Sequence, residues 1–397
     1  MKSKRLNYKE RMNLITKQNH IVVLPSWYAL DKGGIKGSFF REQARALAKK
    51  GYKVSIVYFG IEKKRDKRAY VDDGVNVYIT SGKSIGPLSI IKIWLKTFQM
   101  IWRINKKDSI DLIHVQSFFI GMSAVLFKLL KKTPYIVTEH SSIFLEGKLR
   151  ISSKICASLV YKYASKVICV SKNLGNFVSK YTNHKIEVIH NMVDGAFFKA
   201  KRNNNTDYSS TFYSCGNLIK SKGFMELLSI CKNLKNDGYM FKVIVSGDGP
   251  ERDELEQFVR DNGLDEYILF TGVVSREQVV TYMANSDCFI LLTKYETFGL
   301  VFAEASAVGT PIIMPNIPVS KELINDINGV AVDINKIEKI AETMRKIMNH
   351  ELTYDSAVIR ERCFEQFSES VFVNKYDALI KSVIENSCLQ KNSWKSA

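Results

Sequence analysis

The sequence lacks several patterns that would assign it to common classes of protein. Its seven cysteines include no C-x-x-C pair and several lie in apolar runs, so we expect core thiols in a reducing compartment. No N-terminal segment has the basic-then-apolar form of a signal peptide. The longest apolar stretch, Phe118 to Leu130, is interrupted by Lys128 and is too short to span a bilayer. We therefore expect a cytoplasmic protein.

Positive charge, in contrast, is abundant in the first half of the chain. The 397 residues carry a net charge of +18; residues 1–200 hold 36 Lys and Arg against 13 Asp and Glu, and residues 201–397 hold 22 against 27. The first half is thus expected to meet an anion, which leaves a nucleic acid, an acidic membrane surface and a lipid diphosphate open. Aromatic-interleaved basic strands, recognition helices and zinc spacings are missing, so a nucleic-acid-binding protein is only a distant alternative.

Strand and helix patterns alternate along the chain on both sides of a polar segment, which predicts an α/β protein. The polar segment has no hydrophobic periodicity and is the predicted linker. We find no tandem repeat and no low-complexity tract. The predicted parts are an N-terminal domain (1–198, of which 1–18 is a basic arm), the linker (199–210), a C-terminal domain (211–367), and a terminal helix with its tail (368–397).

Two features of the first domain suggest ligand binding. A strand, a loop containing Gly34 and Gly37, and a helix from Phe39 to Lys50 follow one another, an order that brings backbone amides against phosphate. The loop is not G-x-G-x-x-G, so a nucleotide site and a flexible loop both remain open. His114 and His140 end predicted strands, where open α/β sheets bind ligands.

An amphipathic segment runs from Leu88 to Trp102. It places apolar side chains at helical spacing beside Lys92, Lys96 and Arg103. This pattern fits a helix at a membrane interface and equally a helix packed on the sheet.

The most informative stretch, Thr293 to Ala305, follows a predicted buried strand. Glu296 and Glu304 are separated by seven residues, and Phe298 to Ala307 predicts a helix. Glu296 then lies in the strand-to-helix loop and Glu304 about two turns into the helix. Unpaired N–H groups and the positive dipole end of the helix suit a phosphate, and the two carboxylates suit sugar hydroxyls. The pattern predicts a nucleotide-sugar site; two ordinary surface glutamates are the alternative.

Tyr295 to Ala305, followed by Gly309-Thr310-Pro311, closely resembles the E-x7-E signature of family 4 glycosyltransferases. Pro25-Ser26-Trp27-Tyr28 and the Gly-Ser-Phe-Phe-Arg run from Gly37 are similar to the opening of bacterial members, and the likeness extends from about Ile21 to Leu379. This resemblance implies the GT-B fold: two facing Rossmann-like domains with parallel sheets, and a C-terminal helix that crosses back to the first domain. It also implies retaining transfer of a sugar from a nucleoside diphosphate to an acceptor hydroxyl.

The resemblance further implies roles for individual residues. Glu296 would grip hydroxyls of the donor sugar, Glu304 the ribose diol, and His140 would face the sugar from the acceptor side. Asn217 stands where the family has arginine, so one diphosphate contact is lost or is supplied elsewhere, for example by Lys220. The residues implied in donor binding are Gly34, Gly37, Asn217, Lys222, Val274, Phe298, Gly299, Leu300 and Glu304.

No D-x-D occurs in the sequence, although many nucleotide-sugar enzymes hold a divalent ion with that pattern. We therefore expect no metal and no cofactor, with a UDP- or GDP-linked sugar as substrate. The predicted enzyme is a retaining hexosyltransferase of lipid-linked polysaccharide, O-antigen, lipopolysaccharide or capsule synthesis. Its predicted partners are a lipid-linked or glycan acceptor and the anionic inner face of the plasma membrane. A nucleotide-sugar epimerase or hydrolase of the same fold is the alternative.

Overall fold

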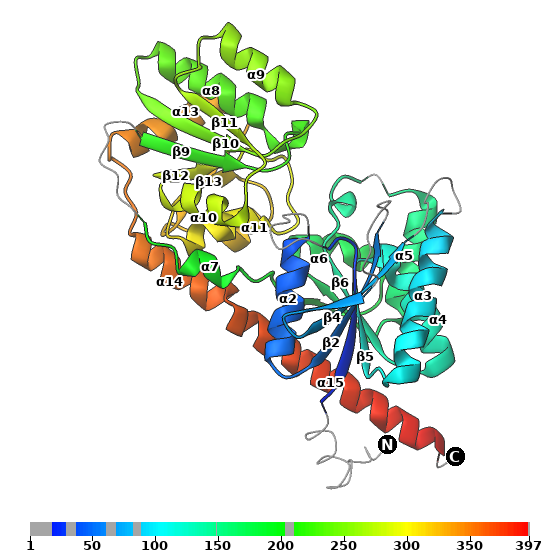
Figure 1. Ribbon diagram of the computed structural model, residues 1–397. Helices are drawn as coiled ribbons and strands as arrows, with labels where there is room; N and C mark the ends of the chain where they lie inside the picture. The colour runs from blue at the N-terminus through cyan, green and yellow to red at the C-terminus, as the bar shows by residue number, and fades with distance from the viewer. Residues whose placement is uncertain are drawn as a thin grey trace. The chain divides into compact units, whose positions relative to one another are not determined.

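The computed structural model describes residues 18–28, 37–60, 69–81, 89–147, 149–202 and 210–395, with side chains up to residue 390. Nearly all of the predicted basic arm, Gly34 and most of the predicted linker lie outside these residues. The chain forms two compact units, one made of residues 1–190 and 370–397 and the other of residues 191–369. Figure 1 shows that each unit is a sheet flanked by helices.

The first unit is built on an eight-stranded sheet in the order β3-β4-β2-β1-β5-β6-β7-β8. Every neighbouring pair is parallel except β3 with β4, which is antiparallel. The short strand β3 was not predicted. The strands are β1 (His20–Pro25), β2 (Lys53–Gly60), β3 (Ala69–Asp72), β4 (Val75–Ser81), β5 (Leu112–Gln116), β6 (Tyr135–Glu139), β7 (Lys166–Cys169) and β8 (Ile186–Val188).

Helices cover both faces of this sheet. In Figure 1, α2 lies on one side of the sheet and α3 and α4 lie on the other. The central strands are buried on both faces, as expected for a parallel sheet covered by helices. The helices are α2 (Ser38–Lys49), α3 (Ser89–Lys107), α4 (Phe118–Lys131), α5 (Ile151–Tyr163), α6 (Lys172–Val178) and the terminal α15 (Glu369–Lys395), with short 3-10 turns η1 (Ser142–Phe144) and η2 (Ser179–Tyr181).

The second unit is built on a six-stranded, all-parallel sheet in the order β11-β10-β9-β12-β13-β14. Its strands are β9 (Ser210–Cys215), β10 (Phe241–Ser246), β11 (Ile268–Gly272), β12 (Cys288–Ile290), β13 (Ile312–Pro315) and β14 (Gly329–Val332). Its helices are α7 (Gly195–Phe198), η3 (Lys220–Lys222), α8 (Phe224–Asn236), α9 (Arg252–Asp261), α10 (Arg276–Ala284), α11 (Leu300–Ala307), α12 (Ser320–Leu323), α13 (Ile337–Met348) and α14 (Ser356–Phe367).

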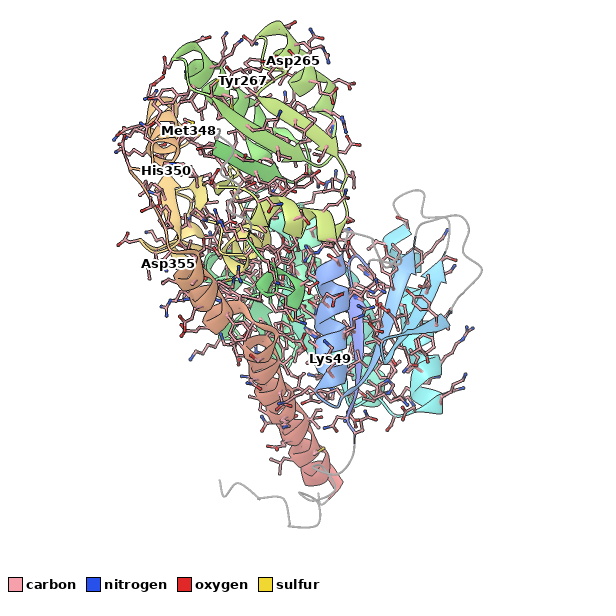
Figure 2. The ribbon with its side chains drawn as sticks, turned by 60° about the vertical axis from the view of Figure 1, so that its left-hand side comes forward. Lys49, Asp265, Tyr267, Met348, His350 and Asp355 are labelled. Carbon is pink, nitrogen blue, oxygen red and sulfur yellow. The ribbon has the colours of Figure 1, made fainter. Side chains whose placement is uncertain are left out.

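The chain returns to the first unit through α15. The hydroxyl of Tyr376 hydrogen-bonds with Thr138 Oγ1 at 2.8 Å, and Tyr52 donates to Asp377 at 2.7 Å. The preceding helix, α14, belongs to the second unit. Its N-cap is Asp355, labelled in Figure 2, and the carboxylate of this residue accepts hydrogen bonds from two amides of the first turn. The predicted return of the C-terminal helix to the first domain is thus confirmed.

Residues 191–198 cluster with the second unit, although the sequence placed them at the end of the first domain. Asp194 caps the short helix α7 by accepting from Ala196 N at 2.9 Å, and the ring of Phe197 is fully buried. Among the described residues, no helix is both long and apolar enough to cross a membrane.

The predicted segment Leu88 to Trp102 is described from Ser89 onward, where it forms most of α3, and this helix packs on its unit. Thr97, Ile101 and Ile104 are buried, whereas Ile91 and Leu95 remain exposed. Packing against the sheet, one of the two predicted alternatives, is therefore confirmed for the inner side of α3. The outer side keeps apolar and basic residues in solvent.

Candidate active site

The order of strands in the second unit creates a ligand-binding edge between β9 and β12. β10 and β11 lie on one side of β9, while β13 and β14 lie beyond β12. The loops that follow β9 and β12 therefore leave the same edge of the sheet and diverge, an arrangement at which open α/β sheets bind ligands. Lys222 lies in the first of these loops and Glu296 in the second. Both residues were predicted at the site.

Close backbone packing brings these two loops together. Gly223 has φ +72°, and a Cβ there would lie 2.1 Å from the carbonyl oxygen of Leu292. Lys294 N donates to Ser221 O at 2.7 Å. Only glycine fits at position 223, both for its backbone angle and for this contact. As a result, the Nζ atom of Lys222 hydrogen-bonds the carboxylate of Glu296, and both side chains are mostly buried.

The start of α11, the helix after Glu296, has features that suit an anion. Gly299 is its N-cap at φ +82°, and Leu300 is its first residue. The first amides of a helix have no acceptor within the helix and carry the positive end of its dipole. Phe298 is fully buried, with its ring 5.4 Å from that of Phe367. Any contact of Phe298 with a donor would therefore come from its main chain.

Glu304 is paired with a cation that the sequence did not reveal. It is 2% exposed, and Arg276 Nη1 lies 2.7 Å from its Oε1. The guanidinium of Arg276 also lies 4.7 Å from the centre of the Phe197 ring. Burial raises the pKa of the Glu304 carboxyl, and the charge of Arg276 opposes that rise. A buried carboxylate requires such a partner, but no local pattern says that it lies 28 residues earlier in the chain.

The remaining predicted donor-binding residues lie on neighbouring loops of this edge. The loop with Asn217 is pressed against the loop after β10, since a Cβ on Gly247 would lie 1.9 Å from Gly216 O. The side chain of Asn217 is exposed. Val274 is buried and lies between β11 and Arg276.

The first unit has an equivalent edge, where β1 and β5 are neighbours and the chain continues away on both sides. Gln116, the last residue of β5, joins the neighbouring strand ends. Ser26 Oγ donates to the carbonyl oxygen of Gln116 at 2.7 Å, and Nε2 of His140 lies 2.6 Å from the Gln116 Oε1 atom. His140, which follows β6, is thus fixed at this edge.

His140 is a neutral histidine in an aromatic environment. The rings of Phe39 and Phe40, at the start of α2, lie 5.4 and 5.0 Å from its ring. Burial lowers the pKa of His140 to about 3, and neighbouring His114 adds to this effect. With Gln116 Oε1 as acceptor, Nε2 carries the proton, and Nδ1 has no hydrogen-bond partner among the described residues. Nδ1 is therefore a buried acceptor without a partner in the described part of the chain.

Glu139 and Gln116 support His140, and sequence reasoning missed both. The buried carboxylate of Glu139 accepts from the amides of Phe118, His140 and Ser141 at 3.1, 3.0 and 2.9 Å. Burial raises the pKa of Glu139, while the amides of Ser141 and Phe118 and the hydroxyl of Tyr161 oppose the rise. The polar residues that end strands β5 and β6 were the only available signal in the sequence.

Of the two loop glycines predicted in the first unit, Gly37 is described. It has φ +81°, and a Cβ there would lie 2.8 Å from the backbone of Trp27 and Tyr28. Gly37 therefore lets the loop after β1 close on the start of α2. His114, predicted at a strand end, lies in the middle of β5, where it is buried and hydrogen-bonds Thr138 Oγ1 at 2.8 Å. The structure gives it a packing role.

Comparison with known proteins identifies the family. A model described as Glycosyltransferase Family 4 matches residues 37–197, and one described as Glycosyl transferases group 1 matches residues 196–362. The chain is a family 4 glycosyltransferase. The O-antigen biosynthesis glycosyltransferase WclY of Escherichia coli is 24% identical to it over 297 residues, which cover 69% of this chain and 81% of WclY.

Solved structures show the same fold as this glycosyltransferase. A sucrose-phosphate synthase from Thermosynechococcus elongatus superposes with a TM-score of 0.80 at 16% identity, over 92% of this chain and 99% of the synthase. Anabaena HepE, solved in complex with UDP and glucose, superposes with a TM-score of 0.68 at 16% identity, over 92% and 100% of the two chains. The predicted GT-B fold and family are confirmed, while the roles of single residues remain predictions.

Proposed function

We propose that this glycosyltransferase moves a hexose from a UDP- or GDP-linked donor to a hydroxyl of a lipid-linked acceptor, with retention at the anomeric carbon and without a metal. One observation carries the proposal. Lys222 and Glu296 are held together in the loops at the β9–β12 edge, and Glu296 directly precedes the amide-rich start of α11. A cation, a carboxylate and a helix N-terminus converge there, as a sugar diphosphate requires.

In the proposed reaction the bond between the anomeric carbon and the diphosphate oxygen breaks. A bond from the acceptor oxygen to the same carbon forms, and the acceptor proton leaves with the departing nucleoside diphosphate. Negative charge grows on the diphosphate, where Lys222 and the first amides of α11 supply fixed positive potential. The lysine ammonium has three donors, so it can contact a phosphate while it remains bonded to Glu296.

The carboxylates have separate proposed tasks. Glu296 accepts hydrogen bonds from hydroxyls of the transferred sugar, and Glu304, oriented by Arg276, accepts from the ribose diol. His140 acts on the acceptor side. Because its ring is neutral, it orients a hydroxyl without adding charge.

The proposed pathway is the synthesis of a lipid-linked surface polysaccharide at the inner face of the plasma membrane. The name of WclY supports polysaccharide synthesis, and the UDP and glucose in HepE favour UDP as the base-linked carrier. The excess of positive charge in residues 1–200 supports an acceptor that is anionic or membrane-bound.

A thermal-shift panel of UDP-, GDP- and ADP-linked sugars tests donor binding. A ligand present at about 100 times its Kd stabilises the folded chain by about 2.7 kcal/mol, so the true donor should stand out clearly. If no nucleotide sugar shifts the transition, while the isolated chain is folded, the proposed donor site is wrong.

Transfer to a lipid-linked acceptor, followed by NMR of the anomeric proton, tests the chemistry. We expect the product to keep the donor configuration, and we expect EDTA to leave the rate unchanged. An inverted product or loss of activity in EDTA would contradict the proposal. Release of free sugar at the transfer rate without acceptor would favour the hydrolase alternative.

A further inference from the structure

The three outer helices of the first unit carry only positive charge. α3, α4 and α5 contain no aspartate and no glutamate. They contain five basic residues on α3 and two each on α4 and α5, namely Lys92, Lys96, Arg103, Lys106, Lys107, Lys128, Lys131, Lys154 and Lys162. The whole chain has 40 acidic residues, so their absence from three helices sets this surface apart.

The same helices expose large apolar side chains. On α5, Ile151 and Ile155 are 77% and 57% exposed, and Leu159 continues the row at a spacing of four residues, on one side of the helix. On α4, Leu129 and Leu130 are exposed at its last turn, with Leu126 one turn before. Ile91 and Leu95 extend the exposed apolar surface to α3.

The helices that carry these residues pack side by side. A Cβ on Gly121 of α4 would lie 2.4 Å from Val160 of α5, so the glycine permits a close approach of the two helices. On the other flank, the indole of Trp94 in α3 donates to Phe119 O at 2.6 Å, and Ser123 Oγ donates to Trp94 O at 2.9 Å. In Figure 1, α3 and α4 lie next to each other on one side of the sheet. We call this layer the α3–α5 face.

A basic groove adjoins the α3–α5 face at the end of α4. It has a volume of about 1240 Å³ and is lined by the ends of α4 and α5, the start of β7 and the C-terminal part of α15. Its lining includes Lys128, Lys131, Lys132 and Lys166 together with Leu129 and Leu389. Lys128 Nζ donates to Tyr163 O at 2.8 Å, and burial lowers its pKa.

We propose that the α3–α5 face docks on the surface of a bilayer that contains anionic phospholipid. Exposed aliphatic side chains among lysines, with no acid, match the composition of surfaces that sit at the boundary of headgroups and acyl chains. Large apolar side chains exposed on three neighbouring helices are typical of an interaction site. A lipid surface is the occupant that supplies both the negative charge and the apolar layer.

Charge argues against a second copy of the chain as the occupant. In a two-fold dimer the same patch meets itself, so the lysines of one α3–α5 face would oppose those of the other without an acidic partner on these helices. Docking on lipid rests on the proposed function, since it would bring the enzyme to an acceptor held in the bilayer.

Co-sedimentation of the full chain with vesicles tests this docking. We expect binding to phosphatidylcholine vesicles to rise at least about tenfold when part of the lipid is phosphatidylglycerol, and to weaken with added salt. Equal binding with and without phosphatidylglycerol, or no binding to either at low salt, would overturn the proposal.

Variants on the face locate the docking surface. Leu130→Glu with Ile155→Glu should lower binding to anionic vesicles at least about tenfold, because both exposed side chains would place a charge against lipid. Met240→Glu in the second unit is the matched control, since Met240 and Leu130 are each 63% exposed. Lys154→Glu tests the contribution of charge and should weaken vesicle binding about fivefold. Lys339→Glu is its control, because Lys339 is also exposed but lies on α13 of the second unit, and this change should leave binding unaltered. Binding unchanged by the variants on the face would exclude this surface.

Two further measurements separate the possible failures. Sedimentation equilibrium should give the mass of one chain; a dimer that the Leu130→Glu and Ile155→Glu changes dissociate would make a second copy the occupant. The thermal shift caused by the donor nucleotide should be the same in these variants and in the wild type. If the wild-type chain fails to bind vesicles while its donor binding and transfer are intact, only the docking is refuted, whereas vesicle binding without any donor binding refutes only the proposed function.

Discussion

The two sheets have similar edges at the carboxyl ends of their strands, where the strand order reverses, but the electrostatics of these edges differ. In the second unit the edge carries two ion pairs, Lys222 with Glu296 and Arg276 with Glu304. In the first unit His140 is neutral and is held by the amide of Gln116 among aromatic rings. Each edge arises where the strand order reverses, so the fold alone does not determine the chemistry.

This difference suggests that the two edges bind chemically different groups. Fixed charges in partly dry surroundings favour a charged ligand such as a nucleoside diphosphate. A neutral acceptor beside aromatic rings can orient a sugar hydroxyl without competing for the diphosphate. The predictions below test whether charge matters at one edge and not at the other.

The largest expected effect comes from Arg276→Met, which leaves the buried carboxylate of Glu304 without its cation. We expect the free energy of unfolding to fall by about 3 kcal/mol, since removing one partner of a buried pair exposes the full desolvation cost of the other. Chemical denaturation measures this. Arg345→Met is the control, because Arg345 pairs with two exposed acids and such pairs contribute about 1 kcal/mol or less.

The same variant has a predicted dependence on pH. Burial raises the pKa of Glu304 in the folded state, so the folded chain binds a proton at this carboxylate more tightly than the unfolded chain does. The contribution of Glu304 to the free energy of unfolding therefore falls as pH rises. Without Arg276 the pKa of Glu304 rises further. The loss of unfolding free energy in Arg276→Met, relative to the wild type, should therefore become smaller as pH is lowered from 7 toward about 5. A deficit that grows on acidification would contradict this assignment, and Arg276→Met with Glu304→Gln should recover part of the stability.

Glu296→Gln should have the next largest effect, on turnover. The carboxylate accepts from sugar hydroxyls in the proposed reaction, and we expect kcat to fall by about 100- to 1000-fold, as for loss of a preorganised active-site contact. Nucleotide binding should remain. Glu304→Gln should show the opposite pattern, with weaker nucleotide binding. Glu361→Gln, on the exposed side of α14, is the control, and an exchange of the two patterns would mean that the assigned roles are reversed.

The sequence was sufficient to predict most of the charged edge because its signals are local. The E-x7-E spacing placed Glu296 before α11 and Glu304 within it, and the structure shows both positions. Gly223 and Gly299 adopt positive φ at strand-to-helix turns, which are positions where glycine patterns are informative. The strand and helix alternation predicted both sheets for the same reason.

The sequence was not sufficient to predict the side-chain partner of a site residue where that partner is set by which strands are neighbours. Arg276 meets Glu304, and Gln116 meets His140, through tertiary contacts that no local spacing encodes. The antiparallel strand β3 was missed because it is four residues long and has no clear alternation. Its Asp72 accepts hydrogen bonds from Arg41 and Arg45 of α2, another pairing invisible to periodicity.

Lys222→Ala tests the phosphate side of the charged edge, with a smaller effect. We expect the Kd for the nucleoside diphosphate to rise by about 10- to 100-fold, as one charge-assisted contact is lost. Titration calorimetry measures this. Lys220→Ala, on the same short turn η3, is the matched control. If Lys220→Ala has the larger effect, the diphosphate is held by Lys220, the substitute considered for the missing arginine.

Asn217→Arg tests the same diphosphate contact by adding a positive charge instead of removing one. The side chain of Asn217 is exposed, and its loop is fixed by the close contact of Gly247 with Gly216, so an arginine can be accommodated without moving the backbone. We expect an approximately three- to tenfold tighter Kd for the nucleoside diphosphate, with stronger salt dependence. Unchanged affinity would show that the diphosphate does not approach this loop.

The neutral edge should respond least to pH, and this is the smallest effect predicted. Burial lowers the pKa of His140 to about 3, so its ring should remain uncharged down to about pH 5 and kcat/KM should show no inflection from this group between about pH 5 and 8. The linked effect on stability has the opposite sign to that of Glu304. Below the usual histidine pKa the unfolded chain binds the proton that the folded chain excludes, so acid destabilises the fold through His140. NMR titration of the ring proton, assigned by its disappearance in His140→Gln, measures the ionisation directly. A midpoint near 7 would mean that a large fraction of the His140 rings is charged at physiological pH, and the contrast between the two edges would then disappear.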